Sequence, residues 1–227
     1  KLLLTDDPTY LGILYGSGMT GQNQVTRVGY PAYSFFVNQQ VYDSNGNPIE
    51  GLYVDRSGAG GTVSGDNNDK YIYHNPVPDY TMGLSLRFNY KNFDLSASSR
   101  ANIGNYVYNM VDAGSSLDQM QQIGYWKNFP RALNKTNFVK RQFSSDYFVQ
   151  NASFFKLDNL SAGYQLNHLV DKLSARVSFT VQNVFTITKY DGLDPEVPYI
   201  DNGTRPGIDS NFYPRARTFI LGVNLTY

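Results

Sequence analysis

Residues that could carry enzymatic chemistry are scarce in this 227-residue chain. It has no cysteine and two histidines, His74 and His168, so a thiolate nucleophile, a disulfide or a Cys/His metal set is not expected. The H-E-x-x-H, G-x-S-x-G and P-loop patterns are absent. Residues 16–21 match G-x-G-x-x-G, but no helical periodicity follows, as a dinucleotide site would require. We expect a glycine-rich strand end there, loop or turn positions for the histidines, and no enzyme.

One loop has the spacing of a calcium site. Asp55, Ser57, Gly60 and Asp66 fit positions 1, 3, 6 and 12 of the twelve-residue calcium loop. Position 5 is Ala59, whose side chain cannot coordinate a cation. The same composition suits a flexible Gly/Asp loop, so Asp55, Ser57 and Asp66 are the metal candidates, and no other cofactor is expected.

Aromatic side chains are concentrated in two long polar stretches, residues 103–151 and 189–215. Rings with polar neighbours can stack on sugars or contact peptides. They can equally pack the loops on themselves or on a partner protein. The candidate substrate or partner residues are Tyr106, Tyr108, Trp126, Phe129, Tyr147, Phe148, Tyr190, Tyr199, Phe212 and Tyr213.

Segments in which apolar and polar residues alternate predict the strands that flank these two stretches. Residues 80–90 (YTMGLSLRFNY) place aromatic and aliphatic side chains on one face and small or polar ones on the other. This length suits the roughly 9–11 residues with which a tilted strand crosses a bilayer, and aromatic residues at both ends of the apolar row are typical of a lipid-facing strand. After a very short turn, residues 93–101 repeat the alternation. Arg87, Asp94 and Arg100 on the polar face would be costly in a dry core but not in a water-filled lumen.

The same pattern returns nearer the C-terminus, in residues 160–166, 175–181 and 218–227. The link at 167–174 is short, whereas the aromatic stretches on either side of this strand pair are long. Outer-membrane barrels have short periplasmic turns and longer outer loops. We therefore expect both aromatic stretches to be extracellular.

The first 75 residues contain shorter strand-like segments. These are residues 10–15, 33–42 and 49–54, and Asn45-Gly-Asn-Pro predicts a turn before the last of them. No internal repeat of solenoid length is present.

Composition agrees with a strand-rich protein. The chain has 19 Tyr, 14 Phe and 20 Gly, residues that favour strands, tight turns and wet aromatic surfaces. Nineteen basic and nineteen acidic residues give no net charge, which argues against nucleic acid as a partner. No stretch reaches the roughly 18 apolar residues of a transmembrane helix, although barrel strands carry a much weaker signal.

Several stretches resemble SusC/RagA-type TonB-dependent transporters. The similarity covers most of residues 27–227, with the motifs in the expected order. The stretches that carry it are residues 45–55 (NGNPIEGLYVD), 75–83 (NPVPDYTMG), 90–95 (YKNFDL), 156–164 (KLDNLSAGY), 189–197 (KYDGLDPEV) and 207–227 (GIDSNFYPRARTFILGVNLTY).

The resemblance implies an active importer in the outer membrane of Bacteroidetes-like bacteria, a multi-pass barrel of about 22 strands around a plug. It implies a SusD-like surface lipoprotein partner, TonB as the energy source, and oligosaccharides or peptides as cargo. The expected fold class is all-β, the C-terminal part of a large antiparallel transmembrane β-barrel, to which this chain would add roughly eight strands. The resemblance also implies that the terminal aromatic residue, Tyr227, is the barrel-assembly signal.

Residues 1–227 are accordingly expected to be the C-terminal portion of the barrel, with the plug, the TonB box and the earlier strands outside this chain. Lys1 then follows an internal cut, or it is an N-terminus created by processing. Family members often have an Asp-rich, calcium-loop-like stretch where this sequence has Ser57-Gly-Ala-Gly-Gly61, which weakens the calcium hypothesis.

Two alternatives remain open. A soluble β-sandwich that binds glycans would pack the faces carrying Leu84 and Phe179 against each other. A passive porin would lack a plug and a lidding partner.

Overall fold

The computed structural model describes residues 8–15, 19–58, 60–63, 68–118, 131–136, 138–170, 173–197 and 206–226. These residues form mostly strands, with a few short helices. The chain divides into two compact units. The strand unit comprises residues 78–104, 152–190 and 213–227, and the loop unit comprises residues 1–77, 105–151 and 191–212.

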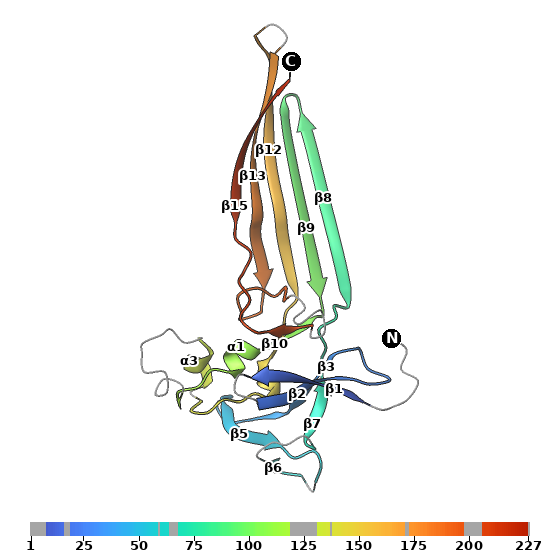
Figure 1. Ribbon diagram of the computed structural model, residues 1–227, viewed down its shortest axis with the longest axis vertical. Coiled ribbons are helices and arrows are strands. Elements are labelled where there is room, and N and C mark those ends of the chain that lie inside the picture. The colour runs from blue at the N-terminus through green and yellow to red at the C-terminus, as the bar shows by residue number, and fades with distance from the viewer. Residues whose placement is uncertain are drawn as a thin grey trace. The chain divides into compact units, whose positions relative to one another are not determined.

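The strand unit is built on one antiparallel sheet of five long strands (Figure 1). The order across the sheet is β15-β13-β12-β9-β8. The strands are β8 (Tyr80–Tyr90), β9 (Phe93–Ile103), β12 (Phe154–Val170), β13 (Leu173–Thr188) and β15 (Thr218–Thr226).

The predicted hairpin is confirmed, because β8 has the expected bounds and β9 follows after a turn at residues 91–92. Lys91 adopts φ +52° in this turn, the left-handed conformation that so short a connection needs. A short link between β12 and β13 was correctly predicted, but its bounds, 167–174, were too wide. Its polar residues suggested a turn, but β12 continues to Val170, which pairs with Leu173 of β13.

The expectation of roughly eight barrel strands is also too high for this sheet. Among the described residues it contains five strands, and the earlier strand-like segments form separate small sheets of the loop unit. Those segments are short, so their alternation could not distinguish a bilayer-spanning strand from a strand of a small sheet.

Strand register sorts the side chains into rows across all five strands. A strand alternates its faces, so successive rows point to opposite sides of the sheet. One row is wholly apolar: Leu86, Ala97, Leu160, Val181 and Phe219. The adjacent row is wholly polar: Ser85, Ser98, Asn159, Gln182 and Thr218.

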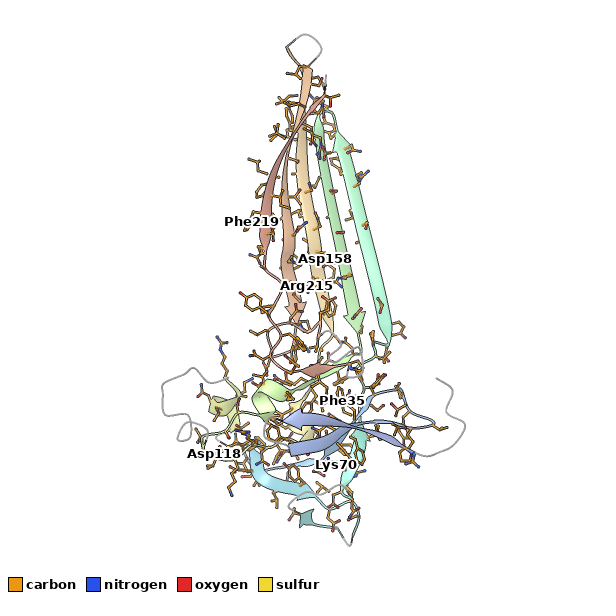
Figure 2. All side chains as sticks on the ribbon, in the orientation of Figure 1. Phe35, Lys70, Asp118, Asp158, Arg215 and Phe219 are labelled. Atoms are coloured by element: carbon orange, nitrogen blue, oxygen red, sulfur yellow. The ribbon has the colours of Figure 1, made fainter. Side chains whose placement is uncertain are left out.

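A β-bulge restores the alternation of β12 around Asp158. Leu157 pairs with Ser99 of β9, and Asn159 pairs with the next residue, Ser98, so Asp158 is the extra residue. A bulge of this kind re-aims a side chain and restores the register beyond it. Here it puts Asp158 and Asn159 with the polar side and returns Leu160 to the apolar row (Asp158 and Phe219 are labelled in Figure 2).

The described residues of the loop unit form three small sheets. The largest has the order β1-β2-β3-β7. Its strands are β1 (Thr9–Tyr15), β2 (Met19–Thr26), β3 (Ser34–Asn38) and β7 (Lys70–Tyr73). The second has the order β4-β5-β6, from β4 (Gln40–Tyr42), β5 (Pro48–Val54) and β6 (Thr62–Val63).

The third sheet joins the two aromatic stretches. The central strand β10 (Tyr106–Asn109) pairs antiparallel with β11 (Val149–Asn151) and parallel with β14 (Ile208–Asp209). The short helices described beside it are α1 (Met110–Ala113), α3 (Ala132–Thr136) and the 3-10 helix η1 (Asp146–Phe148). No helix in the described part of the chain combines the length and hydrophobicity needed to span a bilayer.

Outcomes for the first 75 residues are mixed. The segments 10–15 and 49–54 are confirmed as β1 and β5, and 33–42 splits into β3 and β4. The Asn45-Gly-Asn-Pro turn is confirmed, with Gly46 at φ +83°. Strands β2, β6 and β7 were not predicted, because β2 has few apolar residues and β6 and β7 are too short to show a period.

The core of the loop unit collects side chains that are distant in sequence. Phe35 and Val37 come from β3, Tyr108 from β10 and Ile208 from β14, and all four are fully buried. The first 77 residues and both aromatic stretches therefore fold around one core.

Candidate functional site

The strand unit has one apolar face that is exposed. Leu84 and Phe179 are 55% and 48% exposed, and the strand register places them on the same face of a single sheet. The β-sandwich alternative required the faces bearing these residues to pack against each other, and that arrangement is wrong. An apolar face of this extent needs a covering layer of protein or lipid.

The opposite face carries two ion pairs. Arg176 of β13 donates from Nε to Asp94 Oδ1 at 2.9 Å, and its Nη2 lies 2.5 Å from Oδ2. This fork reaches across β12 above Gly163. A Cβ atom at Gly163 would lie 2.7 Å from Asp94 Oδ2, closer than real Cβ contacts. A side chain at this position would therefore displace the ends of the Asp94 and Arg176 side chains, which occupy the space beside Gly163.

The second ion pair involves Asp158, the extra residue of the bulge. Arg100 Nε donates to Asp158 Oδ2 at 2.9 Å, with both side chains about one-third exposed. Paired charges of this exposure are tolerated where water reaches them. The predicted placing of Asp94 and Arg100 on the polar face of the sheet is confirmed, whereas the water-filled lumen stays a prediction.

Between the ion pairs the polar face forms a shallow groove. Its described lining is mainly hydroxyl and amide groups, from Ser85, Ser98, Asn159, Ser161 and Thr180, together with the Arg87 side chain. The Ser161 and Thr180 hydroxyls lie 2.8 Å apart. Such a surface holds water or a polar solute, and it contains no arrangement for nucleophilic catalysis among these residues.

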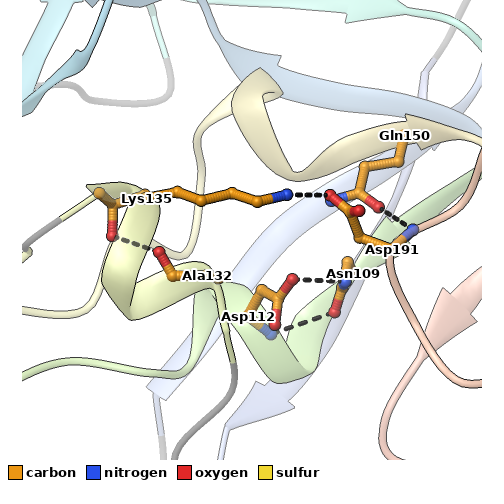
Figure 3. Close-up of polar contacts among 7 residues, drawn as sticks. Asn109, Asp112, Ala132, Lys135, Gln150 and Asp191 are labelled. Carbon is orange, nitrogen blue, oxygen red and sulfur yellow. Dashed lines mark hydrogen bonds and ion pairs between the residues drawn. The ribbon is translucent and has the colours of Figure 1, made fainter.

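In the loop unit, Lys135 and Asp191 connect the two aromatic stretches (Figure 3). Lys135 Nζ of α3 lies 2.8 Å from Asp191 Oδ2, and the Asp191 backbone N–H donates to Gln150 Oε1 at 3.1 Å. Asp191 lies in the stretch 189–197 that carries the family resemblance, but no sequence pattern pairs it with Lys135. The contact holds residues 132–136 against the segment that begins at Asp191.

Asp112 lies beside this contact. Asn109 donates from Nδ2 to Asp112 Oδ2 at 2.8 Å, while the Asp112 backbone N–H donates to Asn109 Oδ1 at 3.1 Å. Burial and then the charge of Asp191 raise the pKa of Asp112 to about 6, against the opposing effect of Lys135. This carboxyl group therefore exchanges its proton in a pH range where ordinary aspartates are ionised.

The predicted aromatic residues occupy different environments. Tyr108 and Phe148 are buried in the core of the loop unit, the environment expected if the rings pack the loops on themselves. Tyr147 is partly buried and meets Phe148 edge to face, with ring centroids 5.2 Å apart. Tyr106 stacks on His74, with centroids 3.6 Å apart and planes 6° from parallel.

The remaining predicted aromatic residues differ in exposure or lie outside the described residues. Tyr190 is buried, Phe212 is partly exposed and Tyr213 is 93% exposed. Trp126, Phe129, Tyr199 and Tyr227 lie outside the described residues. Roles in substrate or partner binding and in barrel assembly stay predictions.

The proposed calcium loop uses its oxygens internally. Asp55 Oδ1 accepts backbone N–H groups of Ser57 and Gly58 at 3.1 and 2.8 Å. The Ser57 hydroxyl donates to Asp69 Oδ1 at 2.9 Å. Asp66 lies outside the described residues, so calcium binding stays a prediction.

Known proteins are similar to this chain in sequence and in fold. No protein-family model matches the chain. A relative from Bacteroides thetaiotaomicron, TonB-dependent receptor SusC, is 42% identical over 241 residues, covering 100% of this chain and 23% of the relative. TonB-dependent receptor P3 of Formosa agariphila is 29% identical, covering 97% of this chain and 25% of the relative.

The fold comparison agrees. A solved structure of the RagAB peptide importer in its open-open state matches with a TM-score of 0.66 at 23% identity, covering 100% of this chain and 25% of that chain. A structure of the RagAB peptide transporter matches with a TM-score of 0.64 at 24% identity, covering 88% of this chain and 23% of that chain.

The chain belongs to the SusC/RagA family of TonB-dependent receptors. The expected fold class is confirmed: this SusC/RagA chain is all-β and forms part of a larger antiparallel barrel, its own sheet being open. It spans about a quarter of the length of the relatives it matches. These relatives are named as receptors and transporters, not as enzymes.

Proposed function

We propose that this chain forms part of an outer-membrane, TonB-dependent active importer of oligosaccharides or peptides. The five long strands would cross the bilayer, with the apolar face toward lipid and the polar face toward the lumen. The observation that carries the proposal is the pair of adjacent five-residue rows, one wholly apolar and one wholly polar, in a chain 42% identical to SusC.

The bilayer would satisfy the exposed apolar face of the sheet. Its two edge strands, β8 and β15, also need partners, because open backbone edges are not tolerated in hydrocarbon. Strands from the rest of the receptor would supply them. The ion pairs Asp94–Arg176 and Arg100–Asp158 would lie in the wet lumen, where their charges keep contact with water.

The loop unit would contribute the extracellular side. It contains the stretches 105–151 and 191–212, which share one core and the Lys135–Asp191 contact. A SusD-like lipoprotein would cover the barrel, with the exposed aromatic residues available to it or to the cargo. TonB would act on a part of the receptor outside this chain.

Uptake measurements in the native host test active import against passive diffusion. A strain lacking the complete receptor gene should lose uptake of one oligosaccharide or peptide nutrient, and a strain lacking functional TonB should lose the same uptake. Uptake that needs the receptor but not TonB would favour the passive porin. Unchanged uptake of every oligosaccharide and peptide tested in the receptor deletion would contradict an import function.

A further inference from the structure

A cationic pocket lies in the loop unit, next to the loop that contains Asp55 and Ser57. It has a volume of about 270 Å³. Three basic side chains and three aromatic rings contribute to its described lining, which contains no Asp or Glu. They are Arg27, Arg56, Lys70, Tyr30, Phe36 and Tyr71.

Lys70 is the most constrained of the basic groups. Its Nζ donates to the Gln22 carbonyl at 2.8 Å and lies 5.8 Å from the centroid of the Phe36 ring. Burial lowers the pKa of the Lys70 ammonium to about 8. The carbonyl and the ring face are neutral groups, so they compensate poorly for the hydration that the ammonium loses on burial. A bound anion would compensate for this loss better.

Arg56 is held beside Lys70 through its backbone. The Arg56 N–H donates to Asp69 Oδ1 at 3.1 Å, and Asp69 directly precedes Lys70. The guanidinium lies 4.6 Å from the centroid of the Tyr71 ring, and its Nη1 donates to Gln39 Oε1 at 2.8 Å. The Asp69 oxygen thus serves the backbone of the adjacent loop, while the Arg56 side chain extends into the pocket lining.

Tyr71 fixes the aromatic wall. Its hydroxyl donates to Asp146 Oδ2 at 2.7 Å, and Asp146 Oδ1 accepts the Gln40 N–H at 2.9 Å. The ring is therefore anchored at its far end, and the Arg56 guanidinium lies over one of its faces. An anchored ring beside two cations is a preorganised site.

We propose that this pocket binds a carboxylate-bearing ligand, with Arg56 and Lys70 contacting the carboxylate and Tyr71 and Tyr30 contacting the body of the ligand. The volume is below the roughly 300–1,000 Å³ of a drug-sized site, so one acidic unit of a longer ligand would occupy it. A uronic-acid sugar and the C-terminal residue of a peptide share this chemistry.

Binding to the purified complete receptor tests the proposal by isothermal titration. The probes are trigalacturonate with its methyl ester, and N-acetyl-Ala-Ala-Tyr with its C-terminal amide. The wild-type receptor should bind at least one acid and bind its neutral form at least about tenfold more weakly, since a hydrogen bond to a charged group is typically of that strength. Binding of the uronate alone or of the peptide alone would identify the source, and either result supports the site.

Variants then locate the site. Lys70→Met and Arg56→Met should each weaken binding of the acid about tenfold or more without changing binding of the neutral form. Lys140→Met, an exposed lysine outside the pocket lining, is the matched control and should bind as the wild type does. Raising NaCl from about 50 to about 500 mM should also weaken binding of the acid to the wild type, because screening reduces attraction between charges.

Three results would overturn the proposal: no binding of either acid, equal binding of an acid and its neutral form, or equal losses in Lys70→Met and Lys140→Met. The receptor's recovery from the outer membrane and its TonB-dependent uptake are measured separately. A negative binding result would therefore not contradict the proposed import function. A negative uptake result would likewise not contradict binding at the pocket.

Discussion

An arginine scan of two neighbouring residues tests which face of the sheet meets lipid. Ser85 and Leu86 are the sixth and seventh of the eleven residues of β8. At about 3.4 Å per residue and a tilt of about 45°, an eleven-residue strand rises about 26 Å, close to the roughly 25 Å apolar band of outer-membrane barrels. Both residues would therefore lie near the bilayer midplane, on opposite faces of the same strand.

Leu86→Arg would put a guanidinium into the apolar row, where Leu86 is 59% exposed. Arginine at the midplane of a lipid-facing strand costs about 2–4 kcal/mol, which lowers the folded-to-unfolded ratio about 30-fold to several hundred-fold. Ser85→Arg would join a row of five polar side chains next to the natural Arg87. It should cost less than about 0.5 kcal/mol, as surface substitutions usually do.

Urea unfolding of the complete receptor in phospholipid vesicles measures both variants against the wild type. Leu86→Ala controls for loss of the leucine itself, so the cost of charge is the difference between the arginine and alanine variants. Equal stabilities for Leu86→Arg and Ser85→Arg, or a larger loss in Ser85→Arg, would refute the assignment of faces.

Three further predictions concern other parts of the chain. Gly163→Ala should destabilise the receptor by up to about 1 kcal/mol, since its methyl group would displace the ends of the solvent-accessible Asp94–Arg176 pair; the same change made together with Asp94→Ser should cost less in urea unfolding, and equal costs would refute the steric explanation. Asp112 has a pKa of about 6 when folded against an ordinary value of 3.8, so the folded state binds more protons between these values and the contribution of Asp112 to stability falls as pH rises through this window. Asp112→Asn should therefore flatten thermal stability between about pH 4 and pH 6, and an unchanged pH profile would contradict the raised pKa. Removal of Tyr227 should reduce the amount of assembled receptor in outer-membrane fractions, whereas normal assembly would exclude a role as assembly signal.

Strict alternation made the long strands predictable. Residues 80–90 carry six apolar and five small or polar side chains in perfect alternation, and β8 has those bounds. Residues 167–174 misled because this polar stretch has the composition of a turn, although the backbone of β12 continues to Val170 and that of β13 begins at Leu173. Asp158 and Asn159 broke the period, and only the paired strands reveal the bulge that absorbs them.

The loop unit was harder to predict because its contacts are distant in sequence. Lys135 meets Asp191 across 56 positions, and Asn38 of β3 donates its N–H to the Ser144 carbonyl. No local period records such pairs. The cationic pocket is a similar case, since Arg27, Arg56 and Lys70 belong to three separate segments and form no motif.

Fractionation of the native host, with intact-mass analysis of the polypeptide that carries this sequence, tests the central claim most directly. The account predicts recovery in the outer membrane, on a much larger chain that co-purifies with a surface lipoprotein. A soluble protein with the mass of these 227 residues alone would contradict it.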